Sequence, residues 1–312
     1  MNNNTLVHLT LTLAFTAVLA ACTSPSHTGG TLVSQADELT QRLINPDGQV
    51  MVVAHRACWR LAPENSLAAI QACIANHIDI VEIDVQRSQD GHLVVIHDLS
   101  VDRTTDGTGL VSDMTLAQLQ LLRLKEFNGG DVANLTSQSI PTLAQAFTAT
   151  RGKVLVNLDA KADVRDQAYA LAEEMGLLDQ IIIKMPLTHP GEELSSFNFY
   201  GNTFFMPIVH EKNGDLGMMV KNFDAEPQVA YEVIYKTEAG LRAACAAASA
   251  QNSRCWLNTL WEGLSPGHSD ERNLDNPDAH WGYVIKELGV NMIQTDRPIM
   301  LTQYLQSKDL HD

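Results

Sequence analysis

Short runs of β-branched and other apolar residues alternate with helical segments along most of this 312-residue chain. Such runs are typical of buried parallel strands, and their alternation with helices predicts repeated βα units. The helical segments lie at residues 66–76, 142–150, 164–176, 238–250 and 279–288. We expect nine strands, at residues 50–55, 78–85, 93–97, 154–159, 181–184, 204–209, 231–235, 255–260 and 291–295.

The third run does not fit a parallel arrangement, because it follows the second after only residues 86–92. A parallel crossover needs a dozen residues or more, whereas a hairpin needs few. We therefore expect an antiparallel arm that turns near Asp90, with Glu82 opposite His97 and Asp84 opposite Val95. Eight parallel strands then remain, which predicts a closed (β/α)8 barrel of the TIM type. The alternative is an open doubly wound sheet, but no glycine-rich phosphate loop follows the first strand.

The composition is that of a globular protein, with 45% hydrophobic and 19% charged residues. It excludes disordered, collagen-like and coiled-coil chains. The formal net charge of −16 argues against a general nucleic-acid binder, which needs a basic surface. An anionic small-molecule substrate would need local positive charge, and a bound metal ion can supply it.

The N-terminus is predicted to be an export signal rather than part of the fold. Residues 1–21 contain no Asp, Glu, Lys or Arg, and an apolar run from Leu9 to Ala21 ends at Cys22. This run is short for a transmembrane helix of about 20 residues and looks like a bacterial lipoprotein signal. The alternative is an ordinary cleaved signal followed by a chance cysteine. We expect a signal peptide at 1–21, lipidation of Cys22, a tether over 22–45 and a barrel domain over 46–312. The protein would then be exported and held at the membrane of the cell envelope.

Four further cysteines lie in the expected barrel domain: Cys58, Cys73, Cys245 and Cys255. Their spacing matches no metal-finger pattern. An exported protein can form disulfides, but the spacing does not decide between bridges and buried free thiols.

Polar residues stand where several predicted strands end, which is the catalytic face of a barrel. Successive strand side chains alternate between faces, so two acidic residues spaced by two point the same way. The candidates are His55 and Arg56 after the first strand, Glu82 and Asp84 in the second, His97 at the end of the arm, and Asp159 and Lys161 after the next strand.

Together these residue types suit the cleavage of a phosphodiester. The three carboxylates would repel one another without a cation, and Mg²⁺ or Ca²⁺ prefers such oxygen ligands. His55 and His97 would supply a general acid and a general base that titrate near neutrality. Arg56 and Lys161 carry fixed positive charge suited to phosphate oxygens. The neighbouring residues Asp98, Asp102, Arg103 and Asp106 lie in a turn-rich stretch, and structural roles are expected for them.

An ordered set of motifs runs through residues 50–307: His55-Arg56, Pro63-Glu64-Asn65, Glu82-Ile83-Asp84, His97-Asp98, Asp102-Arg103-Thr104-Thr105-Asp106-Gly107, Ile140-Pro141-Thr142-Leu143, Trp256 and Thr295-Asp296-Arg297-Pro298. This set resembles the glycerophosphodiester phosphodiesterase family. The resemblance implies a TIM barrel with an insertion at about residues 99–139. It also implies one divalent ion held by Glu82, Asp84 and Asp159, and release of sn-glycerol 3-phosphate and an alcohol. His55 and His97 match the catalytic histidines, and Trp256 is carried over as a substrate-binding residue.

Two positions depart from the family pattern. Ala57 replaces the glycine of a His-Arg-Gly motif, and an alanine held at positive φ costs about 1 kcal/mol or more. Asp159 replaces a longer glutamate, so the ion would lie closer to that strand or reach it through water.

Other functions remain open at this point. One alternative is a lysophospholipase D-like or phosphoinositide-type phosphodiesterase on the same fold, for which an apolar rim of Trp59, Trp256 and Trp261 would be decisive. A second is a surface lipoprotein that binds without catalysis.

Overall fold

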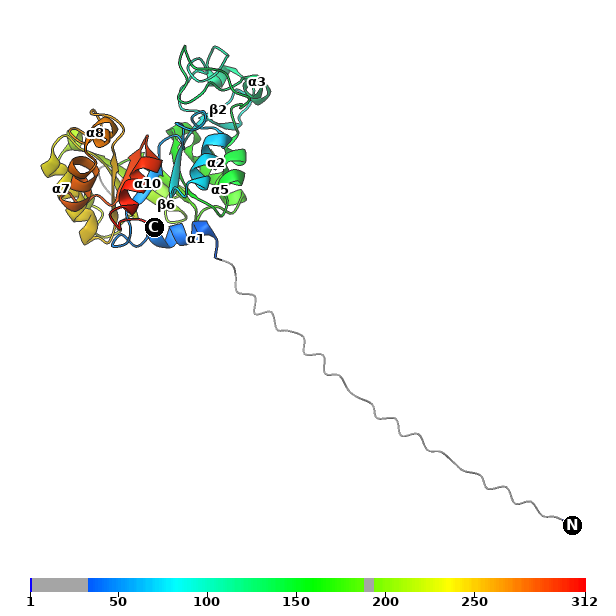
Figure 1. The fold of residues 1–312 in the computed structure, drawn as a ribbon. Coiled ribbons are helices and arrows are strands. Elements are labelled where there is room, and N and C mark those ends of the chain that lie inside the picture. The colour runs from blue at the N-terminus through cyan, green and yellow to red at the C-terminus, as the bar shows by residue number, and fades with distance from the viewer. Residues whose placement is uncertain (2–32, 188–193) are drawn as a thin grey trace. The chain divides into compact units, whose positions relative to one another are not determined.

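Eight parallel strands close into a barrel, with helices on its outside (Figure 1). The computed structural model describes Met1 and residues 33–187 and 194–312; the expected signal peptide and Cys22 lie outside the described residues. The strands are β1 (Met51–Ala54), β2 (Ile80–Arg87), β3 (Leu93–Val95), β4 (Leu155–Ala160), β5 (Ile181–Pro186), β6 (Phe204–His210), β7 (Ala230–Ile234), β8 (Arg254–Asn258) and β9 (Met292–Thr295). Strand β1 pairs with both β9 and β2, which closes the cylinder and confirms the predicted (β/α)8 fold.

The helices are α1 (Gln35–Leu43), α2 (Leu67–Ala75), α3 (Leu116–Leu121), α4 (Leu143–Thr150), α5 (Ala162–Glu174), α6 (Leu216–Lys221), α7 (Glu238–Ala250), α8 (Asp270–Asp275), α9 (Tyr283–Lys286) and α10 (Pro298–Gln306). Hydroxyl side chains fix several starts: Ser66, Thr142 and Thr237 each accept a hydrogen bond from the backbone N–H three residues later. Within the described ranges, no helix is long and apolar enough to cross a membrane.

Strand β3 is the antiparallel arm that the short connection predicts, but its register differs by one residue. Val85 lies opposite Val95, and Arg87 lies opposite Leu93. The connecting loop therefore spans residues 88–92 and turns at Gly91, whose φ of +86° suits glycine. The predicted pairing of Glu82 with His97 is wrong, because a one-residue slip shifts every partner along the arm.

Helix α1 closes the N-terminal end of the barrel. Leu39 and Leu43 pack with the first inward residues of the strands, including Met51 and Ile80. Arg254, at the start of β8, donates to the backbone carbonyls of Arg42 and Leu43 at the end of the helix. The prediction of a tether over residues 22–45 is therefore wrong for 35–43. Apolar residues at helical spacing form a helix there, and this helix covers the N-terminal end of the barrel.

The segment at 99–139, expected to be an insertion, follows β3 and holds α3 and a short 3-10 turn, η1 (Val111–Asp113). It shares a small apolar core with the residues on either side of it, and Figure 1 shows α3 beyond the end of β2, away from α1. That core consists of Val94, Ile96, Val101, Val111, Leu119, Leu124 and Ile140. The insertion thus stands over the end of the barrel where the strands terminate.

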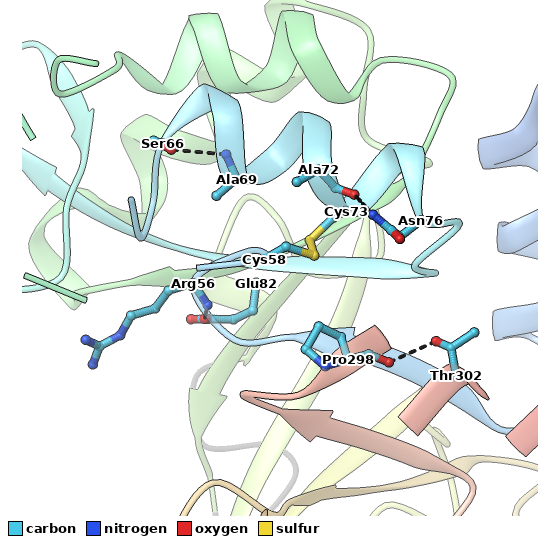
Figure 2. Close-up of a disulfide and its surroundings, with 10 residues drawn as sticks. All are labelled: Arg56, Cys58, Ser66, Ala69, Ala72, Cys73, Asn76, Glu82, Pro298 and Thr302. Carbon is cyan, nitrogen blue, oxygen red and sulfur yellow. Dashed lines mark hydrogen bonds between the residues drawn. A yellow bond between two sulfur atoms is a disulfide. The ribbon is translucent and has the colours of Figure 1, made fainter. Parts of the chain in front are cut away.

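Two disulfides settle the question that the cysteine spacing leaves open. Cys58 is bonded to Cys73, which ties the loop after β1 to α2 (Figure 2). Cys245 is bonded to Cys255, which ties α7 to β8.

Candidate active site

Three acidic side chains meet at the C-terminal end of β2 and β4. Glu82 and Asp84 are two residues apart on β2, so their side chains share one face of the strand. Asp159 of β4 lies directly opposite Asp84 in the parallel register. One carboxylate oxygen from each residue lies within 4.8 Å of the others. The structure therefore brings together the three residues that the sequence predicts as metal ligands.

The electrostatics differ between the members of this cluster. Burial, followed by the negative charge of Asp84, raises the pKa of Glu82 to about 7. Burial also acts to raise the pKa of Asp159, but the charges of Lys184 and Lys161 outweigh it, and the pKa is lowered. Converging carboxylate oxygens fit a hard divalent cation such as Ca²⁺ or Mg²⁺. The cluster is thus consistent with a divalent metal site.

The loop after β1 wraps around these carboxylates. The backbone N–H of Arg56 donates to Glu82 Oε2 at 2.8 Å, and the two residues lie beside each other in Figure 2. Asn65 Nδ2 donates to Asp84 Oδ2 at 2.8 Å, while the backbone N–H of Asp84 donates back to Asn65. These contacts orient both acidic groups.

This loop is held in a left-handed conformation. Arg56 has φ +51°, Ala57 has φ +60° and Asn65 has φ +57°. Position 57 thus adopts a positive φ, so Ala57 bears a backbone cost of about 1–2 kcal/mol that glycine would avoid. Its buried methyl group packs in the core and offsets part of that cost.

His55 follows β1 and is fixed by a carboxylate from the end of the chain. Its Nδ1 lies 2.8 Å from Asp296 Oδ1, and Trp59 Nε1 donates to the same oxygen at 2.7 Å. Burial alone would lower the pKa of His55, but the hydrogen bond with Asp296 and the charge of Glu82 outweigh it and raise the pKa. With Nδ1 engaged by Asp296, Nε2 is the ring nitrogen left for proton transfer.

His97 is also held through its Nδ1, in this case by the aspartate that follows it in the sequence. Its Nδ1 lies 2.7 Å from Asp98 Oδ1. Arg103 grips both Asp98 oxygens at 2.8 Å and reaches Glu64 at 2.7 Å. The hydrogen bond to Arg103, followed by that to His97, lowers the pKa of Asp98 against the effect of burial. Asp98 and Arg103, for which purely structural roles are expected from sequence, thus orient a candidate catalytic histidine.

The two predicted phosphate-binding cations lie in different surroundings. Arg56 is mostly buried; its Nη1 lies 3.2 Å from both Glu64 oxygens and its Nε 3.7 Å from Asp84 Oδ2. Lys161 is exposed just before α5, and its charge lowers the pKa of Asp159. Lys161 also lines a cavity of about 580 Å³ between the barrel and the insertion.

Trp256 does not reach the mouth of the barrel. Its side chain is 0% exposed and lies in the apolar cluster that α1 covers. The expectation that it binds substrate is not met, because β8 turns this side chain into the lower barrel interior, where its Nε1 donates to Asn258. Trp261 is an exposed aromatic residue beside the site: it is 48% exposed, and its ring centroid lies 6.3 Å from that of His55.

A buried lysine that the sequence analysis misses lies beneath the acidic cluster. Lys184 Nζ is 3.3 Å from Asp159 Oδ2, 3.6 Å from Glu232 Oε2 and 3.9 Å from Glu82 Oε1. Its sequence signal is a lysine that follows Ile181-Ile182-Ile183 in a buried strand, in line with Ile182 on the inward face.

Comparison with known proteins agrees with this geometry. Residues 55–184 match the model of the glycerophosphoryl diester phosphodiesterase family, and residues 205–305 match a domain of unknown function. A glycerophosphodiester phosphodiesterase of Caldanaerobacter subterraneus is 38% identical over 156 residues, which cover 49% of this chain and 60% of the relative. Glycerophosphodiester phosphodiesterase 1 of Homo sapiens is 32% identical over 156 residues, covering 50% and 45%. The chain thus matches about half to 60% of the length of these two relatives.

Solved structures share the fold over most of the chain. A glycerophosphoryl diester phosphodiesterase from Parabacteroides distasonis has a TM-score of 0.69 and 24% identity, covering 88% of this chain and 93% of that one. A phosphodiesterase of Oleispira antarctica, solved in complex with the product sn-glycerol-3-phosphate, has a TM-score of 0.58 and 19% identity, covering 83% and 97%. Residues 55–184 thus match the glycerophosphoryl diester phosphodiesterase family, on a barrel fold that the chain shares with these solved structures.

Proposed function

We propose that this protein is a metal-dependent phosphodiesterase that hydrolyses glycerophosphodiesters to sn-glycerol 3-phosphate and an alcohol. The observation that carries the proposal is the placement of two histidines, each held through Nδ1 by its own aspartate, beside a cluster of three carboxylates. The names of the relatives and the product bound to the Oleispira antarctica protein support this substrate class.

Glu82, Asp84 and Asp159 would hold one Ca²⁺ or Mg²⁺ ion. When bound, such an ion neutralises phosphate oxygen charge and polarises the phosphorus centre. The protein supports these ligands through Arg56 N–H on Glu82 and Asn65 on Asp84, so their oxygens are oriented before the ion arrives.

The two histidines would move the protons of the reaction. One Nε2 takes the proton of the attacking oxygen. Attack by water gives sn-glycerol 3-phosphate directly, whereas attack by the neighbouring glycerol hydroxyl gives a cyclic phosphate that a water molecule then opens to sn-glycerol 3-phosphate. The other Nε2–H gives a proton to the departing alcohol oxygen as the P–O bond breaks. Asp296 and Asp98 keep Nδ1 engaged and so present Nε2 of His55 and His97. Transfers of this kind contribute roughly 10²–10⁴-fold each.

The test is a panel of glycerophosphodiesters, beginning with glycerophosphocholine, assayed after chelation and after re-addition of Ca²⁺ or Mg²⁺. We expect release of sn-glycerol 3-phosphate only with metal, and a loss of kcat of at least about 100-fold in His55→Ala and in His97→Ala. His92→Ala, an exposed histidine outside the cluster, is the matched control. Metal-independent turnover, or near-normal turnover by either variant, would contradict the proposal.

A second candidate substrate, a lysophospholipid, is favoured by one observation. A cavity of about 150 Å³ beside Asp296 is lined by Leu61, Pro298 and Met300, and Leu61 is 56% exposed. With exposed Trp261 near His55, these residues offer an apolar wall to an acyl chain. The same assay with lysophosphatidylcholine decides between the two, and Leu61→Asp is expected to reduce only lysophospholipid turnover.

We further propose that the protein is exported and lipid-anchored through Cys22. The leader composition supports this, and so do two disulfides among the described residues, which form in oxidising compartments. Membrane fractionation of the full chain in a bacterial host should find it in the membrane fraction, and Cys22→Ala should release it. Recovery of both forms in the soluble fraction would refute the anchor.

A further inference from the structure

We propose that Lys184 is a placeholder cation: its ammonium group occupies the acidic cluster while no metal is bound and opposes metal binding, so it sets the affinity of the site. The inference rests on the proposed metal dependence. Lys184 would not touch the ion or the substrate; it would act on metal affinity through the carboxylates that it contacts.

The position of Lys184 Nζ carries the proposal. The ammonium group lies 3.3 Å from Asp159 and 3.9 Å from Glu82, two of the three residues that would hold the ion. The side chains of Lys184 and Glu82 are only 7% and 2% exposed, so water screens this pair poorly, whereas Asp159 is 40% exposed and its pair is screened more. A divalent ion that takes the same carboxylate oxygens would be repelled by this charge.

A fourth carboxylate provides a place for the ammonium group when it is displaced. Glu232 Oε2 lies 3.6 Å from Lys184 Nζ, is fully buried, and makes no hydrogen bond within the described part of the chain. This oxygen already forms an ion pair with Lys184 but no hydrogen bond, so a short movement of the ammonium group toward it would complete one.

Glu232 is itself held rigidly. Its Oε1 accepts from Asn258 Nδ2 at 2.8 Å, and Asn258 Oδ1 accepts from Trp256 Nε1 at 2.6 Å. Trp256, which the sequence assigns to substrate, thus lies at the base of a chain of contacts that ends at the metal site.

The charges predict opposite effects for two substitutions. Lys184→Met removes the repulsion of the ion and keeps the length of the side chain. Glu232→Gln removes a negative charge near the ion and keeps an oxygen for Asn258. We therefore expect tighter metal binding in the first variant and weaker binding in the second.

The experiment is titration calorimetry of the chelator-treated full protein with CaCl₂ and with MgCl₂ at pH 8. Lys184→Met should bind at least tenfold more tightly than wild type, and Glu232→Gln at least threefold more weakly. The double variant restores the charge balance and should return to within a few fold of wild type. Lys221→Met, an exposed lysine in the last turn of α6, is the control and should not differ.

Thermal unfolding gives a second readout that a merely structural role would not move in this direction. Lys184→Met should melt at a lower temperature than wild type in chelator but gain more on addition of Ca²⁺, because tighter binding to the folded state stabilises it more. Equal or weaker affinity in folded Lys184→Met, beside a wild type that binds metal, would overturn the placeholder alone. A wild type that binds neither ion would overturn both the placeholder and the metal dependence.

Discussion

Arg103, in the insertion, contacts the carboxylates of two residues that flank the candidate site. Its guanidinium lies between Asp98, which holds His97, and Glu64, which holds Arg56. A single planar group with several donors suits this bridging position, because it satisfies two carboxylates in fixed geometry. We therefore expect Arg103 to position the histidine rather than to touch the reacting atoms.

We expect Arg103→Met to lower kcat by about 10- to 100-fold with a smaller change in KM, because such outer partners orient the reacting groups. The pH profile of kcat should change as well, since Asp98 loses the charge that holds it ionised. Steady-state kinetics from pH 5 to pH 9 measure both. Arg123→Met, which removes an exposed pair with Asp106 in the same insertion, should behave as wild type. Equal losses in the two variants would point to general damage instead.

Most of the site can be predicted from sequence because its residues form short motifs at strand ends. Side chains alternate between the two faces of a strand, so the spacing shows which of them point the same way. Lys184 and Glu232 escape this reasoning, because they meet across the barrel interior from β5 and β7, with β6 between them. Trp256 shows the converse: its motif is recognisable, but only packing shows that its side chain lies in the lower barrel.

At the level of elements, all nine predicted strands are present, because buried strands are recognisable in the sequence as apolar runs. The sequence does not predict α3, α6 and α8, since six residues carry little periodic signal, and it also misses the nine-residue helices α1 and α10. The hairpin register is wrong by one residue because the position of a positive-φ glycine in the turn, here Gly91, decides it.

Helix α1 and the C-terminal residues share a buried ionic contact. Asp79 accepts from Arg42 of α1 at 2.9 Å and lies 2.9 Å from His311 Nε2. Burial lowers the pKa of His311, but the hydrogen bond with Asp79 outweighs it, and the pKa is raised above 6.5. The stabilisation by protonated His311 is therefore full below pH 6.5 and disappears as pH rises through the higher pKa of the folded protein.

His311→Gln should accordingly cost about 1–2 kcal/mol of unfolding free energy near pH 5.5 and clearly less at pH 9. Denaturant unfolding of wild type and variant at the two pH values measures the difference. His92→Gln, at an exposed position, should show no such dependence. A larger loss at pH 9 than at pH 5.5 would reverse the assigned sign.

For the molecule as a whole, the two disulfides act on different parts of the barrel. Cys58–Cys73, with a sequence separation of 15, restrains the loop that carries Arg56 and Asn65. Cys245–Cys255, with a separation of 10, joins α7 to β8. Loops of these sizes give similar stabilisation, about 3 kcal/mol each.

Replacing either pair by alanines should therefore lower the free energy of unfolding by about 3 kcal/mol. Only loss of Cys58–Cys73 should also weaken metal binding and lower kcat, because only this bridge restrains the loop on Glu82 and Asp84. Denaturant unfolding and calorimetry at a temperature where both variants are folded separate the two effects. Equal activity losses would show that the bridges act through global stability.

The net charge of −16 has a different meaning once the barrel is seen. Four of the acidic residues, Glu82, Asp84, Asp159 and Glu232, gather around Lys184 at the barrel mouth and interior. This local excess is what would attract a divalent ion, which in turn makes an anionic phosphodiester acceptable. The acidity of the whole chain and an anionic substrate are thus compatible.

The two ends of the barrel differ in whether a fused peptide would obstruct the candidate site. Asp312 pairs with Arg42 of α1 at 2.8 Å, so the C-terminus lies at the plugged end, with the insertion and histidines at the other. A peptide tag fused after Asp312 would therefore leave the mouth clear. The protein could be coupled to a bead or an electrode by that end, with the mouth of the barrel of every copy facing the solution.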